Sequence, residues 1–142
     1  MGEYLKTRNQ LTESIFNTSF GEVETAIFSN QPFKQTSLNQ LTEDLAKTFG
    51  IGKVKTTQML GISDSRKSRN QSISPDILDR AASYIQFFAR VSSIIGADAT
   101  KQWLQSPKQA LKGACPIDLL STRLGQSQLG DMLTALEDGA YL

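Results

Sequence analysis

Apolar side chains recur at steps of three and four residues along most of the chain after residue 36. In the first such run the apolar positions are Leu38, Leu41, Leu45 and Phe49. This spacing is that of an α-helix with one buried face. Ser37 is a favourable N-cap before the run, and Gly50 suits the left-handed position that ends a helix. The pattern therefore predicts a helix over residues 38–49.

A second, shorter helix is expected over residues 53–60, with Gly61 supplying a turn after it and Ile62 a core contact. The polar and basic segment 64–71 follows. A helix, a glycine turn and a basic segment in this order are typical of a helix-turn-helix, in which Arg and Lys pair with phosphates and Asn and Gln read adenine. The segment has no apolar residue to anchor a recognition helix, so a solvated basic loop is the alternative.

The longest apolar run begins at Ser74-Pro75-Asp76, which is typical of a helix start. Ser74 is a favourable N-cap, Pro75 suits the first helical position, and the acidic Asp76 faces the positive end of the helix dipole. Apolar residues then occupy more than one face of the predicted helix as far as Ile95, and Gly96 ends the helix. A helix this apolar is more often central core than a ligand site. In a chain of this length, we expect part of it to be buried between the two subunits of a homodimer.

The remaining residues alternate bulky apolar side chains with Gly and Pro, which predicts several short helices. The first, over residues 97–104, carries Trp103 as an anchor in the core, and its indole N–H needs one acceptor. One or two helical turns are expected at residues 117–120. Thr122 then caps a final helix, which Gly139 ends. Together with the upstream runs, this pattern predicts an all-α fold.

Residues 1–35 are polar and mixed, with scattered apolar side chains. One helix face could be lined by the apolar residues Phe16, Phe20, Val23 and Ile27. Gly21 weakens that pattern, so we expect an arm that is partly disordered or docks on a partner subunit. The chain then divides into this arm over 1–35, a helix-turn-helix-like DNA-binding region over 36–80 and a helical domain over 81–142.

The amino-acid composition excludes several kinds of catalytic and metal site. The 142 residues include no histidine and one cysteine, Cys115. A histidine-based catalytic triad and an internal disulfide are thereby excluded, and a zinc site with nitrogen and sulfur ligands nearly so. No apolar run approaches the roughly 20 residues that span a bilayer, and the N-terminus lacks a secretory pattern. We expect a cytoplasmic binding protein without metal or cofactor rather than an enzyme.

The net charge of +1 conceals a local excess of cations. Residues 53–69 contain five basic side chains and one acidic one. Basic side chains neutralise phosphates, so a nucleic-acid contact is expected in this part of the chain. The expected DNA contacts are Lys53, Lys55, Arg66, Lys67, Ser68, Arg69 and Asn70.

Many spaced positions in the last third of the chain form a pattern together. They are Trp103-Leu104, Pro107, Ala110-Leu111, Gly113, Pro116, Asp118-Leu119-Leu120, Thr122, Gly125 and Glu137-Asp138-Gly139-Ala140-Tyr141. This pattern resembles the toxin-binding domain of Xre/MbcA/ParS-type antitoxins. Upstream, Leu60-Gly61-Ile62-Ser63 and Ser74-Pro75 resemble the Xre-like helix-turn-helix of the same family, although the stretch between residues 63 and 73 is a few residues shorter.

The resemblance implies an antitoxin of a type II toxin–antitoxin system, with an Xre-like helix-turn-helix region followed by a small helical dimerisation and toxin-binding domain. The implied partner is a RES-domain toxin, an ADP-ribosyltransferase-like enzyme that consumes NAD, whose active site the C-terminal tail would cover. The implied antitoxin is a homodimer that binds operator DNA and represses its own operon. The alternative is a helix-turn-helix transcriptional regulator without a toxin partner.

The implied toxin contacts cluster near the C-terminus. They are Trp103, Pro107, Lys112, Glu137, Asp138, Gly139, Ala140, Tyr141 and Leu142. Acidic side chains and a terminal carboxylate would complement the cationic groups with which an enzyme binds NAD phosphates. Tyr141 offers a rigid aromatic anchor for an interface. In the alternative, Tyr141 folds back onto its own core.

Overall fold

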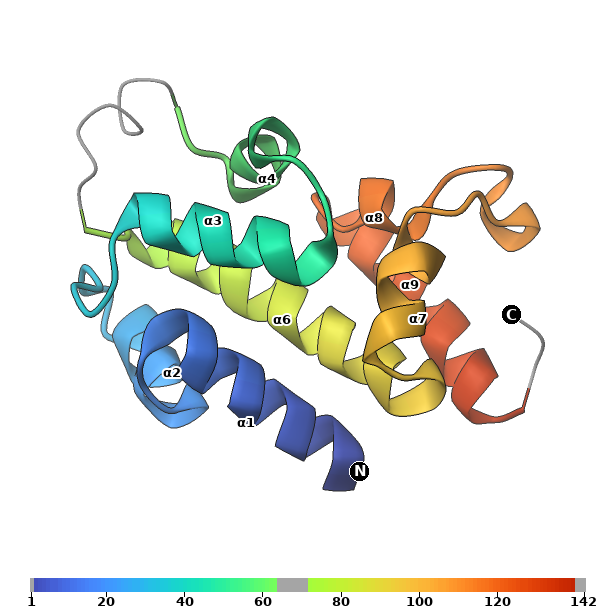
Figure 1. The fold of residues 1–142 in the computed structure, drawn as a ribbon, viewed down its shortest axis with the longest axis horizontal. Helices are drawn as coiled ribbons and strands as arrows, with labels where there is room; N and C mark the ends of the chain where they lie inside the picture. Colours follow the sequence, from blue (N-terminus) through green and yellow to red (C-terminus); the bar gives the residue numbers. More distant parts are fainter. Residues whose placement is uncertain (1, 64–71, 140–142) are drawn as a thin grey trace.

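A long central helix organises the fold. The computed structural model describes residues 2–63 and 72–139, in which α6 (Pro75–Ile95) runs through the centre (Figure 1). In this view its flanks carry α1 (Gly2–Phe16) and α2 (Phe20–Phe28) on one side, and α3 (Leu38–Phe49) and α4 (Lys53–Leu60) on the other. The predicted all-α fold class is confirmed.

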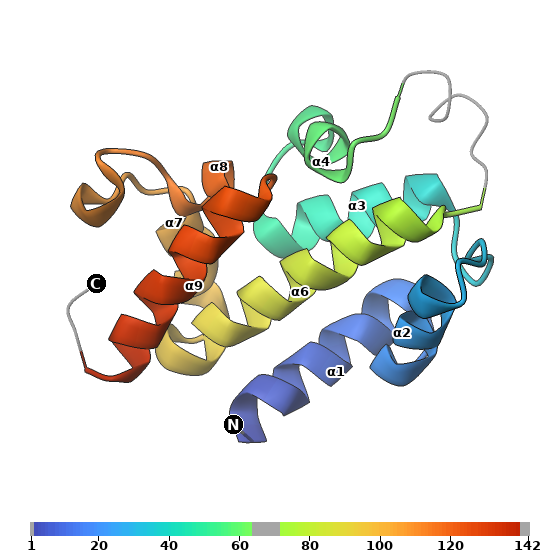
Figure 2. The same cartoon turned by 180° about the vertical axis from the view of Figure 1, so that it is seen from behind.

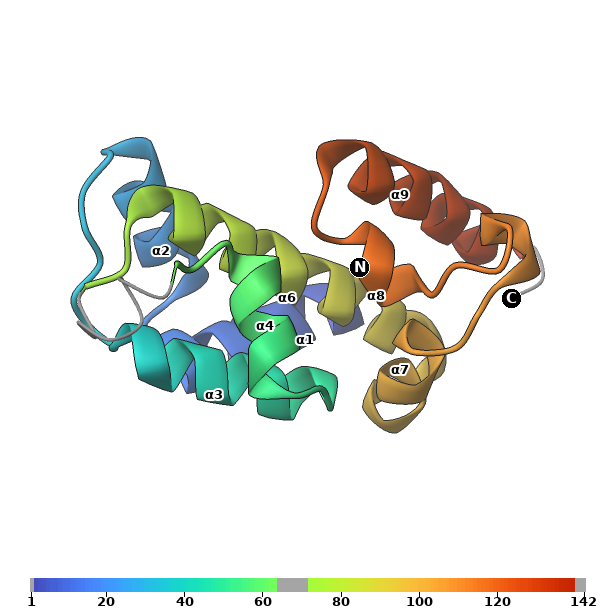
Figure 3. The ribbon, with the colours of Figure 1, turned by 90° about the horizontal axis from the view of Figure 1, so that it is seen from above.

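The C-terminal helices gather at the far end of α6 (Figure 2, Figure 3). They are α7 (Ala97–Leu104), the short 3-10 helix η1 (Gln109–Leu111), α8 (Pro116–Leu119) and α9 (Arg123–Glu137). Because a helix rises 1.5 Å per residue, the 21 residues of α6 separate its two ends by about 30 Å. The chain enters α6 just after the basic segment expected to contact DNA, and leaves it towards the helices expected to contact a toxin.

Helices α3 and α4 begin and end where the sequence predicts. The Ser37 hydroxyl accepts a hydrogen bond from the Gln40 N–H at 3.0 Å, and Gly50 closes α3 in the left-handed conformation, with φ +69°. Gly61 closes α4 in the same way, with φ +71°. A residue with a Cβ is strained at such a φ, and glycine avoids this strain. The predictions for these two helices are confirmed.

Helix α6 starts at Pro75 and ends before Gly96, as predicted. Ser74 occupies the N-cap position, but its hydroxyl donates to the Asp76 carboxylate instead of capping a backbone N–H. From residue 81 to residue 95, every side chain is buried or half-buried. Helices of the same chain cover the wide apolar stripe, so the stripe alone does not require a second subunit. The homodimer therefore stays a prediction.

Residues 1–35, expected as an arm, contribute two helices to the core. Their buried apolar side chains are Ile15, Phe16, Phe20, Val23 and Phe33. Asn17, with φ +58°, turns the chain between α1 and α2, and the Ser19 hydroxyl caps α2 by accepting the N–H three residues on. The turn changes the direction of the apolar face, so the two helices do not follow one continuous period. Both pack against α6, and this part of the chain is not a free arm.

An isolated antiparallel bridge joins the chain before α3 to the chain before α6. The Phe33 N–H donates to the Ile73 carbonyl at 2.8 Å, and the Ile73 N–H donates to the Phe33 carbonyl at 2.9 Å. Both side chains are buried, and Phe33 meets Phe16 edge to face at 5.6 Å. The core is continuous across the boundary expected at residue 80, because α6 runs through it. The assignment of DNA binding to residues 36–80, and of dimerisation and toxin binding to residues 81–142, stays a prediction.

A cap and a close helix crossing hold the C-terminal helices together. The Thr122 hydroxyl accepts the Gly125 N–H at 3.0 Å and caps α9, as predicted. At Gly125, α9 passes α8 so closely that a Cβ would lie 2.0 Å from the Leu119 carbonyl oxygen. The buried side chains of this group include Trp103, Leu104, Ile117, Leu120, Leu129, Leu133 and Leu136. Within residues 2–63 and 72–139, no helix is long and apolar enough to cross a bilayer.

Candidate functional site

The last turn of α9 is tied to α6 by an arginine. Nη2 of Arg90 lies 2.8 Å from Oε1 of Glu137 and donates to the Thr134 hydroxyl at 3.0 Å. The Arg90 and Glu137 side chains are 30% and 41% exposed, so this ion pair is partly shielded from water. Asp138 and Gly139 follow it and are exposed. Glu137, an expected toxin contact, is thus engaged within the chain, whereas Asp138 is accessible to a partner.

A groove of about 520 Å³ lies between the η1 segment and α9. Its lining residues are Ala110, Leu111, Lys112, Gln128, Asp131, Met132 and Ala135. Lys112 on one wall and Asp131 on the other bring opposite charges to the groove. Lys112 has φ +56°, a left-handed conformation that turns the chain after η1. The structure therefore places Lys112 beside the helix that carries the expected contacts at 137–139.

Trp103 supports this region from inside the core. The residue is 6% exposed, and Nζ of Lys108 lies 5.2 Å from the centre of its aromatic ring. Its indole N–H is buried and has no hydrogen-bond acceptor among the described residues, where one acceptor was expected. Pro107, in the loop that follows, is exposed. Pro107 is therefore accessible to a partner, whereas a direct toxin contact by the buried Trp103 stays a prediction.

Several predicted contacts lie outside the described residues. They are Ala140, Tyr141 and Leu142 of the tail, and Arg66, Lys67, Ser68, Arg69 and Asn70 of the basic segment. The alternatives for the basic segment, a recognition element or a solvated loop, therefore stay open. The same holds for a tail that reaches a partner or folds back. The described chain fixes where each segment starts, after Ser63 and after Gly139.

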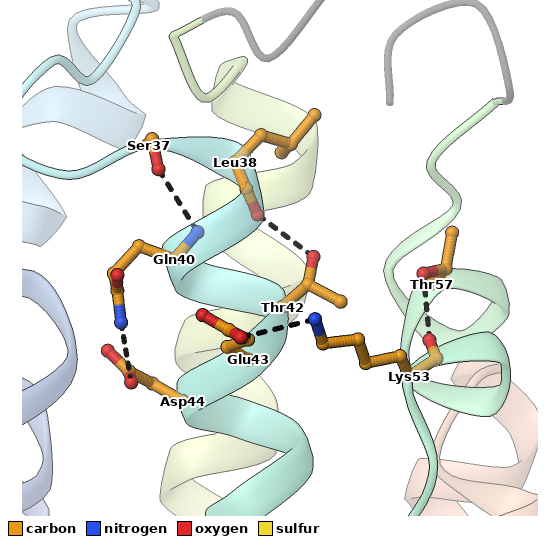
Figure 4. Close-up of polar contacts among 8 residues, drawn as sticks. All are labelled: Ser37, Leu38, Gln40, Thr42, Glu43, Asp44, Lys53 and Thr57. Carbon is orange, nitrogen blue, oxygen red and sulfur yellow. Dashed lines mark hydrogen bonds and ion pairs between the residues drawn. The ribbon is translucent and has the colours of Figure 1, made fainter. Parts of the chain in front are cut away.

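The two described lysines among the expected DNA contacts have different neighbours. Nζ of Lys53 lies 3.1 Å from Oε1 of Glu43 on α3 (Figure 4). Nζ of Lys55 lies 2.7 Å from Oδ1 of Asp118 on α8. Residues two apart on a helix do not share a face, so these two lysines do not form one basic surface. Each ammonium group is already paired with a carboxylate, and contact with DNA stays a prediction for both.

Two residues of α6 hold the end of α4, where the chain approaches the basic segment. Nη1 of Arg80 donates to the Leu60 carbonyl at 3.3 Å, and the Tyr84 hydroxyl donates to the Met59 carbonyl. The Arg80 guanidinium occupies the space that a Cβ at Gly61 would need. Burial raises the pKa of Tyr84 above its usual value of 10.0, and the positive charge of Arg80 opposes this shift in part. These bonds satisfy carbonyls that a helix end leaves unpaired.

Polar contacts also join α3 and α4 to the C-terminal helices. The Gln105 amide, just after α7, donates to the carbonyls of Phe49 and Gly50 at 3.3 and 3.1 Å. The Gln105 carbonyl accepts from the Cys115 thiol at 3.4 Å. Together with the ion pair between α4 and α8, these bonds connect the two regions in which DNA and toxin contacts are expected.

Sequence reasoning missed the residues that make these connections, above all Arg90, Arg80 and Gln105. The importance of Arg90 could have been predicted, because it is the only charged residue between positions 81 and 95. A lone charge in a buried helix requires a partner. Arg80 and Gln105 lie among other polar residues, so nothing local distinguished them.

No cluster of three or more His, Cys, Asp or Glu side chains that could hold a metal ion occurs in residues 2–63 and 72–139. The groove at η1 and α9, and a second of about 380 Å³ between α3 and α4, are lined by a mixture of apolar, polar and charged side chains. A mixed lining of this kind is found on protein surfaces in general, interfaces included.

The C-terminal helices match a known family. Residues 93–139 match the model of the antitoxin Xre/MbcA/ParS C-terminal toxin-binding domain. This range contains α7, η1, α8 and α9, and so includes both walls of the groove and the turn that Arg90 holds. It ends at Gly139, where the described part of the chain also ends.

Individual antitoxins are also similar to the chain. "Antitoxin Xre" of Pseudomonas putida is 32% identical over 76 residues, which is 53% of this chain and 48% of that protein, so the chain matches about half of its length. The "Probable mycobacterial cidal antitoxin Rv3188" of Mycobacterium tuberculosis is 30% identical over 104 residues, which is 70% of this chain and 87% of that protein. The resemblance recognised in the sequence is confirmed, and the chain belongs to the Xre/MbcA/ParS family of toxin–antitoxin antitoxins.

Proposed function

We propose that this antitoxin neutralises a RES-type, NAD-consuming toxin by covering the toxin's active site with its C-terminal tail, residues 137–142. The observation that carries the proposal is the match of residues 93–139 to a toxin-binding domain. The matched range ends on Asp138 and Gly139, both exposed, so residues 140–142 of the tail follow directly on the matched domain.

Charge complementarity supports an NAD site as the target of the tail. An enzyme binds the phosphates of NAD with cationic groups, and a carboxylate at a fixed helix end can occupy the same groups. Asp138 supplies such a carboxylate at the end of α9. Gly139, with φ +99°, redirects the chain at this point. This action needs no catalytic group or cofactor in the antitoxin, so we propose a binding protein and not an enzyme.

Deleting residues 140–142 tests the proposal. The truncated chain should keep the far-UV circular dichroism and the Tm of the full chain, but it should no longer rescue bacteria that express the toxin encoded by the adjacent gene. With purified proteins, the full chain should stop NAD consumption by that toxin and the truncated chain should not. Phe28→Ser, which replaces an aromatic side chain 82% exposed on α2, is the control and should rescue normally.

Two results would contradict this function. Full rescue by the truncated chain would exclude the tail as the neutralising element. A neighbouring toxin that consumes no NAD would exclude the RES type.

We further propose that the antitoxin is a cytoplasmic homodimer that represses its own operon through segment 64–71. The support is the succession of α3, α4 and a basic segment, with the end of α4 held by Arg80 and Tyr84. Alanine at Arg66, Lys67 and Arg69 should abolish a salt-sensitive shift of the antitoxin's own promoter fragment. Lys53→Ala should weaken it less, because Lys53 is already paired within the chain. The repressor role fails if the wild-type chain gives no shift at low salt.

A helix-turn-helix regulator without a toxin partner is the second candidate, and the same succession of α3, α4 and a basic segment favours it. The two assays separate the candidates. Such a regulator shifts its promoter fragment in the same way, but it neither rescues cells from the product of the adjacent gene nor changes NAD consumption.

A further inference from the structure

Arg90 has no role in the proposed function so far. It is the only charged residue between positions 81 and 95, and its neighbours Ala89 and Val91 are buried. Its guanidinium bonds to α9, at 3.0 Å from Oγ1 of Thr134 and 2.8 Å from Oε1 of Glu137. Removing a charge from water is costly unless the charge is paired. The residues that pair with Arg90 therefore indicate its role.

The α9 residues that Arg90 contacts lie on one face of the helix. Thr134 and Glu137 are three residues apart, which brings their side chains together. The Thr134 hydroxyl also donates to the Gly130 carbonyl at 3.0 Å. It is therefore held in one orientation, donating to its own helix and accepting from Arg90. A single nitrogen of Arg90 thus binds two side chains of the last turn of α9, which leads to the tail.

Few apolar contacts hold this end of α9. Leu133 and Leu136 are the last buried side chains of the described chain, and Asp138 and Gly139 after them are exposed. Helix ends fray within their last turn where few side chains fix them. The direction in which the chain leaves α9 therefore depends on Leu136 and on the ion pair between Arg90 and Glu137.

We propose that Arg90 is a positioning residue for toxin binding: through Thr134 and Glu137 it fixes the last turn of α9, and with it the direction of the tail that enters the toxin. Glu137, the first residue of the tail, then acts within the antitoxin, and the contact with the toxin falls to residues 138–142. The inference rests on the proposed function, because it requires that the tail contacts the toxin. Holding the start of the tail in place lowers the entropy lost on binding, so losing Arg90 weakens binding without removing a contact.

Charge reversal separates the two roles that Glu137 could have. Arg90→Gln, Glu137→Gln and Glu137→Arg each break the ion pair, whereas Arg90→Glu combined with Glu137→Arg rebuilds it with the charges exchanged. Arg90→Lys keeps the positive charge but offers a shorter, less directional donor group. The control is Glu43→Gln, which breaks the exposed ion pair between Glu43 on α3 and Lys53 on α4. The readouts are the Kd for the toxin encoded by the adjacent gene, measured by biolayer interferometry, and the Tm of the antitoxin.

The expected pattern concerns both toxin binding and the stability of the antitoxin. Each substitution that breaks the pair should weaken toxin binding about three- to tenfold, with Arg90→Lys between these variants and the wild type. The charge-reversed pair should bind within about twofold of the wild type, because the two substitutions are coupled. Glu43→Gln should bind as the wild type does. The Tm of every variant should stay near that of the wild type, since partly exposed ion pairs contribute little to stability.

Two results would overturn the inference. If the charge-reversed pair binds as weakly as Glu137→Arg alone, Glu137 contacts the toxin directly. If all variants at Arg90 and Glu137 bind as the wild type does, the last turn of α9 needs no positioning. Failure of the proposed function looks different, because the chain lacking residues 140–142 would then bind as tightly as the full chain. Weak binding by that truncated chain, with unchanged binding by the Arg90 variants, removes this inference alone.

Discussion

Replacing Gly125 with alanine adds one methyl group where α9 crosses α8. The new Cβ would lie 2.0 Å from the Leu119 carbonyl oxygen and 2.8 Å from the Thr122 hydroxyl oxygen. To reach an ordinary contact of 3.4 Å, the two helices must separate by about 1.4 Å. Thr122 must also shift, which endangers its cap on the N–H of residue 125.

Two effects of this substitution oppose each other. Alanine is a better helix former than glycine, by up to about 1 kcal/mol in a helix interior and by less near its start. Overpacking costs about 1–3 kcal/mol, and loss of the cap adds about 1 kcal/mol. The steric cost is larger, because the Leu119 carbonyl is backbone and cannot rotate away. We expect Gly125→Ala to lower the free energy of unfolding by about 2 kcal/mol.

Gly130, in the same helix, offers a matched control. A Cβ there would have its nearest contact at 3.9 Å, from Nη1 of Arg90, so Gly130→Ala should be neutral or stabilise by up to about 1 kcal/mol. Both variants are unfolded in urea and followed by far-UV circular dichroism and by the fluorescence of Trp103, the single tryptophan of the chain. If Gly125→Ala is as stable as Gly130→Ala, the close crossing does not have the effect inferred from its geometry.

Three further predictions concern other parts of the molecule. Tyr84→Phe removes the hydrogen bond to the Met59 carbonyl and should cost about 1 kcal/mol at neutral pH. Because burial raises the pKa of Tyr84, its stabilising effect is present below pH 10.0 and is lost as the pH rises through the raised pKa, so urea unfolding should show a steeper alkaline loss in the wild type than in the variant. Phe16→Ala should lower the free energy of unfolding by about 3–5 kcal/mol, whereas a free N-terminal arm would show no such loss. A double-mutant cycle with alanine at Lys55 and Asp118 should give a coupling below about 1 kcal/mol that weakens with salt, because their side chains are 44% and 53% exposed.

The helices that depend on local signals could be predicted from the sequence. Ser37, Gly50 and Thr122 act on backbone groups within a few residues of themselves, so the sequence alone places the ends of α3 and the start of α9. Helices α1 and α2 were harder to predict, because the turn at Asn17 interrupts their apolar period. Their burial also depends on α6, which lies much later in the chain.

The candidate site depends on contacts that a sequence pattern does not contain. The family resemblance predicts a toxin contact for Glu137, and the charge pattern predicts a DNA contact for Lys55. The structure pairs these two side chains with Arg90 and Asp118. Such pairing depends on which helices meet in the fold. The groove beside Lys112 is also formed by two separate segments, and its existence could not be derived from either segment alone.

The bridge between Phe33 and Ile73 lets the chain before α6 change in length. Ile62 is buried on one side of this stretch, and Ile73 is held on the other side by hydrogen bonds of 2.8 and 2.9 Å to Phe33. For any flexible connection between two fixed points, each doubling of its length changes the free energy of loop closure by only about 0.6 kcal/mol. A change of length between these two points should therefore leave the helices at the opposite end of α6 unchanged.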